Sequence, residues 1–209
     1  HSLLKKNNSY IEFGFKESVK DLDKLINIFS KLGYVYEKKS SLLINLSIGE
    51  DNVWKNFKSR ARNMIRKAIK SGIIAVTVSP DLRWISDYYN MLEITFKKQG
   101  LAVPHPKSFY NELIRLYELG LVKCVEVRKN SKIIAASIFV IDKKRITYFS
   151  GVVDKEGMKL AASSLIQWHL IKESINDNIE EYDMGGLGID SIDKFKRSFG
   201  GEDIAHHRW

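Results

Sequence analysis

The chain has 209 residues, of which 44% are hydrophobic and 11% aromatic, and it contains a single cysteine, Cys124. This composition supports a folded core, and it excludes both intrinsic disorder and a disulfide-stabilised scaffold. The net charge of +9 favours an anionic partner such as tRNA, a nucleotide or a pyrophosphate-linked precursor, although lysines spread over a solvated surface would give the same total. No apolar run approaches the roughly 20 residues of a membrane span, and no signal-peptide pattern opens the chain. We therefore expect a cytoplasmic location.

Hydrophobic spacing predicts an alternation of short strands and helices. In chain order, the predicted elements are a strand at 10–15, a helix at 19–32, strands at 34–36 and 42–46, a basic helix at 51–71, a strand at 73–78, helices at 84–98 and 106–119, strands at 122–128, 133–141 and 145–153, a helix at 161–176, a strand at 179–184 and a short helix at 191–198. The turns KNSK and DKK are short, so we expect the three consecutive strands to form antiparallel hairpins. Cys124 lies in one of these strands, where we expect a buried thiol.

The predicted helix at 51–71 carries charge of one sign on one stripe. Its basic residues recur at every fourth position and are Lys58, Arg62, Arg66 and Lys70. No acidic residue occurs between Asp51 and Asp81 to neutralise them. Because unbalanced charge repels itself, we expect Arg62 and Arg66 to contact phosphate groups of a ligand. The alternative is that these side chains pack by their stems or pair with acids elsewhere in the fold.

From residue 73 onwards the predicted order is β-α-α-β-β-β-α-β-α. This order resembles that of the GNAT acyltransferases, the GCN5-related N-acetyltransferase superfamily. The resemblance implies a mixed α/β (α+β) fold with a mostly antiparallel central sheet flanked by helices. It also implies that the fourth and fifth strands of that sheet splay apart to admit an acyl donor.

Two sequence motifs narrow the resemblance. The stretch RARNMIRKAIKSGI, at 60–73, resembles the R-x-x-I-R-K-A-x-x-x-G-I signature of the Fem-type (FemABX) peptidyltransferases. Tyr182-Asp183 followed by two glycines, with FKRSFGG at 195–201, resembles the Y-D-x-x-G…F-K-x-x-F-G-G ending of the same family. The resemblance covers residues 34–201.

The resemblance implies an aminoacyltransferase that moves an amino acid from aminoacyl-tRNA to an amine of a peptidoglycan precursor. The implied partners are aminoacyl-tRNA and an anionic precursor linked to a nucleotide or lipid pyrophosphate. Fem-type enzymes have two GNAT-like domains. Residues 73–209 therefore correspond to one complete GNAT-like domain, and residues 1–72 to the C-terminal part of a first, incomplete half that includes the basic linker helix. The start at His1-Ser2, without a methionine, is interpreted as a tag remnant, a truncation or an unseen N-terminal part.

Two departures from the family patterns concern phosphate groups. Where Fem-type enzymes often carry T-x-x-R-x-G, this chain has TFKKQG at 95–100, so Lys98 replaces an arginine suited to a pyrophosphate and lacks its bidentate fork. The GNAT motif for coenzyme A, Q/R-x-x-G-x-G/A, is absent from DKEGMKLAASS at 154–164. We therefore expect no bound cofactor, with acetyl- or acyl-CoA as the alternative donor.

Amide formation from an aminoacyl ester needs a cation near the developing oxyanion, which is the largest contribution that such a site makes. Lys196 is the expected catalytic cation, and the resemblance implies that Phe195 lines the pocket beside it. Asp183, at the end of a central strand, is expected either to orient a group and accept a proton or to cap the following turn. Tyr148 and Tyr182 are expected substrate contacts, with core or rim tyrosines as the alternative.

No metal-ligand set is expected. His206-His207 has no spaced carboxylate or thiol, and His169 falls in an apolar helix, so these histidines are interpreted as structural or incidental. Two further functions stay open beside the aminoacyltransferase: an acyl-CoA-dependent GNAT N-acyltransferase, and a non-catalytic GNAT-like module that binds nucleic acid or a glycopolymer.

Overall fold

The computed structural model describes residues 14–16 and 20–209, and within this part of the chain the strands form one eight-stranded sheet. The strands are β1 (Gly14–Lys16), β2 (Glu37–Asn45), β3 (Ala75–Val78), β4 (Val122–Lys129), β5 (Lys132–Asp142), β6 (Arg145–Val153), β7 (Glu181–Gly186) and β8 (Glu202–Arg208). Their order in the sheet is β1-β8-β2-β7-β6-β5-β4-β3. Every neighbouring pair is antiparallel except β6 and β7, which are parallel. The predicted fold class, a mixed and mostly antiparallel sheet flanked by helices, is confirmed.

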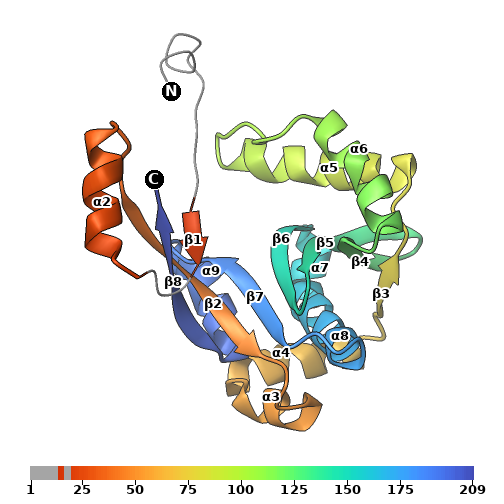
Figure 1. Ribbon diagram of the computed structural model, residues 1–209. Coiled ribbons are helices and arrows are strands. Elements are labelled where there is room, and N and C mark those ends of the chain that lie inside the picture. The colour runs from red at the N-terminus through yellow and green to blue at the C-terminus, as the bar shows by residue number, and fades with distance from the viewer. Residues whose placement is uncertain (1–13, 17–19) are drawn as a thin grey trace.

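Helices cover both faces of the sheet (Figure 1). They are α2 (Leu22–Lys31), α3 (Glu50–Asn56), α4 (Ser59–Lys70), α5 (Leu82–Lys98), α6 (Lys107–Glu118), α7 (Lys155–Lys159), α8 (Ala162–Asn176), α9 (Asp190–Lys196) and the 3-10 turn η1 (Arg197–Phe199). Alternate residues of β4 and β5 enter two separate apolar cores, because side chains of a strand point to opposite faces. Val125 and Phe139 pack with α3, α4 and α8, whereas Cys124 and Ile138 pack with α5 and α6. The thiol of Cys124 is fully buried, as predicted.

The two hairpins predicted from the turns KNSK and DKK are confirmed, since β4 pairs with β5 and β5 with β6 in antiparallel register. The strand predicted at 10–15 falls largely outside the described residues. The strand predicted at 34–36 is wrong, because these residues form no strand and lie just before β2. The strand predicted at 42–46 is the second half of β2, which begins at Glu37. The prediction missed α7 and β8. The sequence EDIAHHR of β8 is mostly polar and lacks the apolar alternation by which a strand is recognised.

The basic helix predicted at 51–71 is instead two helices, α3 and α4, separated at Phe57. Phe57 has an extended backbone, which turns its ring into the core against Trp168 and Phe199. The guanidinium of Arg62 then donates to the carbonyl oxygens of Phe57 and Lys55 at the end of α3. Burial of the Phe57 ring and satisfaction of these carbonyls stabilise the break.

The strand β2 lies between β7 and β8, with which it pairs on its two sides. Residues 37–45 therefore complete the same sheet that residues 75–208 form. The assignment of residues 1–72 to an incomplete first half stays a prediction, but the part that the structure describes contributes directly to the sheet of the following domain.

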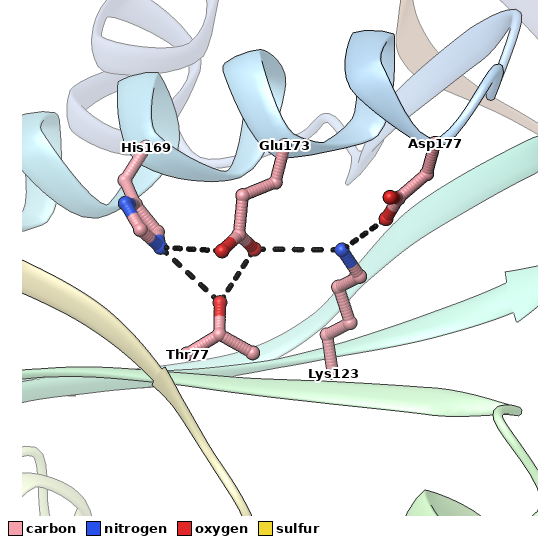
Figure 2. Close-up of polar contacts among 5 residues, drawn as sticks. All are labelled: Thr77, Lys123, His169, Glu173 and Asp177. Carbon is pink, nitrogen blue, oxygen red and sulfur yellow. Dashed lines mark hydrogen bonds and ion pairs between the residues drawn. The ribbon is translucent and has the colours of Figure 1, made fainter.

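A polar cluster fixes the second half of α8 to the edge strand β3 and its neighbour β4 (Figure 2). Glu173 accepts a hydrogen bond from Thr77 Oγ1 at 2.5 Å and lies 3.2 Å from His169 Nε2. Lys123 Nζ bridges the two carboxylates of the helix, at 3.4 Å from Glu173 and 2.5 Å from Asp177. Burial lowers the pKa of His169. His169 is thus engaged in contacts that hold the fold, and the cluster sets the position of α8 relative to the sheet.

In the described part of the chain, no helix combines the length and the apolar character that a membrane crossing requires.

Candidate active site

The parallel strands β6 and β7 pair over three residues only and then separate. The paired residues are Arg145–Thr147 of β6 and Glu181–Asp183 of β7. Beyond this point a cavity of about 1320 Å³ opens between the strands, which we call the splay cavity. Figure 1 shows β6 and β7 diverging, and β2, α5, α8, α9 and β8 supply further walls.

A bulge in β7 stabilises this separation. The register between β2 and β7 shifts beside Gly185, whose φ of +78° is readily accessible only to glycine. A Cβ on Gly185 would lie 3.1 Å from the carbonyl oxygen of Tyr148 on β6, so a side chain there would crowd the point where the strands part. Asp183 Oδ1 accepts a hydrogen bond from Gly185 N at 2.8 Å. Asp183 thus supports the turn, one of its two expected roles; a catalytic role for it stays a prediction.

Lys196 extends from the last turn of α9 to this gap. Its side chain is buried, and Nζ donates to the carbonyl oxygen of Gly186 at 2.6 Å. Burial lowers the pKa of the Lys196 ammonium, while Asp193 and Asp183 act in the opposite direction. Among the residues that the structure describes, Gly186 is its one hydrogen-bond acceptor, which leaves two N–H groups for a ligand in the splay cavity.

The motif around Lys196 holds it in place through aromatic packing. Phe195 lines the splay cavity and packs edge-to-face on Phe199, with ring centroids 5.2 Å apart. Phe199 is fully buried and contacts Phe57. Gly201 follows with a φ of +89° in close contact with the backbone of β2. The motif thus joins α9 to both α3 and β2, and these contacts determine where the ammonium lies.

Tyr148 forms part of the opposite wall of the splay cavity. Burial raises the pKa of Tyr148 to about 12, against the opposing effect of a hydrogen bond with Ser137. A Cβ on Gly151 would overlap the phenol oxygen, so the small residue makes room for the ring. Tyr148 is therefore a neutral hydroxyl on the cavity wall, in a position suited to the substrate contact predicted for it.

The remaining predicted site residues lie outside the splay cavity. Tyr182 is fully buried, packs on Phe139 and donates to Gln167 Oε1, so the core surrounds it and Gln167 is the residue that lines the cavity. Lys98 is exposed at the end of α5.

Arg62 and Arg66 belong to α4, at a distance from the splay cavity. The guanidinium of Arg62 is occupied by the backbone carbonyls at the end of α3. Arg66 is exposed, and its Cζ lies 5.5 Å from the centre of the Trp54 ring. The phosphate contacts expected of both residues stay predictions.

The N-terminus of α8 is the part of the splay cavity best suited to an anion. The helix begins after Ala161, whose left-handed backbone carries no side-chain cap, and Ser163 of its first turn lines the cavity. Backbone N–H groups at a helix start attract phosphate groups, so this end fits a phosphate-bearing donor.

Several residues that line the cavity were not predicted as site residues, among them Ser41, Gln167 and His206, the last of which was interpreted as structural or incidental. Gln167 lies inside an apolar helix and carries no motif. Ser41 and His206 come from β2 and β8, and only the pairing of these strands brings them to the cavity.

A mixed sheet whose parallel strands pair over three residues and then separate around a cavity is the arrangement that the resemblance to the GNAT acyltransferases implied. The family model of the acetyltransferase (GNAT) domain matches residues 55–197. The chain therefore belongs to the GNAT family, and the resemblance drawn from its sequence is confirmed.

Solved structures show the same fold. The chain is similar to FemX, with a TM-score of 0.71 and 13% identity over 99% of this chain and 73% of that chain. It is similar to L-PGS from Bacillus licheniformis, with a TM-score of 0.66 and 8% identity over 99% and 70% of the two chains. It is also similar to the C-terminal domain of a putative lysylphosphatidylglycerol synthetase from Agrobacterium fabrum, with a TM-score of 0.61 and 13% identity over 99% and 69%. No curated protein matches the sequence.

Proposed function

We propose that this GNAT-family protein is an aminoacyltransferase that moves an amino acid from aminoacyl-tRNA to the amine of a peptidoglycan precursor. The observation that carries the proposal is the position of Lys196, whose ammonium lies at the gap between β6 and β7 with two donors available. A fixed cation at that point stabilises the oxyanion that forms when an amine attacks an ester carbonyl. The motif that delivers it, FKRSFGG, is the one that resembles the Fem-type enzymes.

The chemistry starts from a neutral acceptor amine in the splay cavity. Its nitrogen attacks the ester carbonyl, and Lys196 donates to the oxygen on which negative charge develops. Collapse of the intermediate breaks the bond to the tRNA ribose oxygen and leaves an amide. Phe195 and Tyr148 are suited to contacting the reacting groups, because both line the cavity.

An acyl-CoA-dependent N-acyltransferase is the second candidate. The observation behind it is the uncapped N-terminus of α8 beside Ser163, whose backbone N–H groups are suited to the pyrophosphate of coenzyme A. The two functions differ in the donor alone, and a direct comparison of donors separates them.

The test is a transfer assay with radiolabelled aminoacyl-tRNA and a peptidoglycan precursor that ends in a pyrophosphate-linked nucleotide. We expect incorporation of the label into the precursor, in amounts that depend on enzyme concentration. Acetyl-CoA replaces the tRNA in a parallel reaction. Transfer from acetyl-CoA alone would refute the proposal in favour of the second candidate.

The exposed side of α4 and the neighbouring α8 is the expected contact for the body of the tRNA. Its cations are Arg66, Lys67, Lys70 and Lys172, which we call the basic face. Among the described residues none of the four forms an ion pair. Lys172 Nζ lies 5.7 Å from the centre of the Trp168 ring, and Arg66 Cζ lies 5.5 Å from that of Trp54. Unpaired cations on one surface fit the phosphate backbone of RNA.

Reversing two of these charges, Lys67→Glu with Lys70→Glu, is expected to weaken tRNA binding at least tenfold at low salt. In a plot of the logarithm of the association constant against the logarithm of the salt concentration, the slope should become shallower by about two. Each lysine that contacts a phosphate contributes roughly one to this slope. Filter binding over a series of salt concentrations measures both. The control, Lys24→Glu with Lys31→Glu on α2, changes the net charge equally. If the two double variants weakened tRNA binding equally, the effect would come from the total charge of the chain and not from the basic face.

A further inference from the structure

A serine and a histidine from two different strands form a hydrogen-bonded pair on the wall of the splay cavity. Ser41 of β2 is 2% exposed, and its Oγ lies 2.7 Å from Nε2 of His206 on β8. Both residues line the cavity. This distance is that of a hydrogen bond between a hydroxyl and an imidazole.

The sheet register places this pair beside the catalytic cation. Ser41 faces Gly186 directly across the antiparallel pair of β2 and β7. Facing residues in such a pair have Cα atoms about 5 Å apart. The carbonyl oxygen of the same Gly186 accepts the hydrogen bond from Lys196 Nζ. Ser41 and Lys196 thus both neighbour Gly186, one by strand pairing and the other by a hydrogen bond, and both line the splay cavity.

Amide formation needs a destination for the proton of the attacking amine. Lys196 does not accept it in its ammonium form, and Tyr148, with its pKa raised to about 12, is not a base near neutral pH. Asp183 uses Oδ1 to accept from Gly185 N, and so supports the turn. A neutral imidazole behind a hydroxyl is a common solution to this problem.

We propose that Ser41 and His206 accept the proton that the acceptor amine loses. This inference rests on the acyl transfer of the proposed function and holds for either donor. In the step, the amine nitrogen forms a bond to the carbonyl carbon, its proton moves to Ser41 Oγ, and the Ser41 proton moves to His206 Nε2. The bond from the carbonyl carbon to the ribose oxygen, or to the thiol sulfur of coenzyme A, then breaks. His206 returns the proton through Ser41 to that leaving atom.

The two residues have different roles. Ser41 contacts the substrate and is catalytic, whereas His206 acts through Ser41 and is a positioning residue. The step requires that the Ser41 hydroxyl donates to Nε2, so the ring proton of neutral His206 lies on Nδ1.

The test compares Ser41→Ala and His206→Gln with the wild-type chain in the transfer assay, using both donors. We expect each variant to lower kcat about 100-fold, the effect of losing a general base. The Kd for the donor, measured by filter binding, should not change. Ser41→Thr keeps a hydroxyl at the same place and should recover most of the rate.

Hydroxylamine provides a readout that a purely structural role would not affect. Hydroxylamine reacts in its neutral form and gives up its proton more readily than an alkyl amine. The rate of hydroxamate formation should therefore fall much less in Ser41→Ala than the rate of transfer to the amine acceptor. Ser47→Ala and His105→Gln, outside the cavity, serve as controls for serine and histidine loss. Circular dichroism confirms that each variant is folded.

Three outcomes would overturn the inference: a wild-type rate in Ser41→Ala, an equal loss with both acceptors, or an acyl adduct on Ser41 in the mass spectrum of the intact protein. Transfer from acetyl-CoA alone would refute the proposed function, but the same variants would still decide the role of the pair with that donor. The absence of transfer from either donor would refute both.

Discussion

Replacing Lys196 by methionine is expected to lower kcat for acyl transfer by about 100- to 1000-fold, the cost of removing one oxyanion donor. Methionine keeps the length of the side chain and much of its volume, so α9 should keep its place. The Kd for the donor should change little, because the ammonium acts on charge that develops during the reaction. Single-turnover rates with labelled aminoacyl-tRNA, combined with filter binding, measure the two quantities separately.

The matched control is Lys194→Met, on the same short helix but exposed to solvent. It removes the same charge from the chain and should leave kcat at the wild-type value. A Lys196→Met variant that reacts as fast as the Lys194→Met variant would remove Lys196 from the catalytic mechanism.

Replacing Gly201 by alanine is expected to lower the free energy of unfolding by about 3 kcal/mol, at the upper end of common single substitutions. Gly201 has a φ of +89°, and a Cβ there would lie 2.5 Å from the carbonyl oxygen of Leu43 and 3.0 Å from the side chain of Ile44. Since the contact is with backbone of β2, relief requires movement of the strand. Urea denaturation followed by circular dichroism measures the change.

Gly72→Ala isolates the contribution of the backbone conformation. Gly72 has a similar φ of +76°, but a Cβ there would meet no atom within 4 Å. The free energy of unfolding of Gly72→Ala should therefore fall only by the cost of the left-handed conformation, about 1 kcal/mol. Equal losses for the two variants would show that the close contact with Leu43 contributes nothing to stability.

The contacts of Gly201 and Phe199 hold the segment that carries Lys196, the proposed catalytic cation. Gly201 brings the chain close to β2, and Phe199 fills the space beside Phe57. A shift of this segment would move α9, which carries Phe195 and Lys196. We therefore expect Gly201→Ala to lower the rate as well as the stability.

Local pattern was enough to predict the elements whose side chains alternate or recur with a regular period. The hairpins of β4, β5 and β6 follow from apolar runs separated by short polar turns, and α5, α6 and α8 follow from helical spacing. Phe195 and Lys196 were proposed as site residues from the resemblance of FKRSFGG to the Fem-type ending, and both lie on one short segment. Residue periodicity and motif spacing are properties of the sequence by itself. Together with the predicted order of strands and helices, they were enough to identify the resemblance to the GNAT family.

Only the tertiary structure decided what depends on contacts between distant segments. The break at Phe57 depends on a core made by Trp168 and Phe199, so a basic helix that is continuous in its sequence pattern becomes two. Arg62 is drawn to orphan carbonyls at the end of α3, which exist only because of that break. The insertion of β2 between β7 and β8 joins Ser41 to His206 across 165 residues of chain. Local periodicity carries no record of which strands become neighbours, because backbone hydrogen bonds between strands are nearly independent of the side chains that they connect.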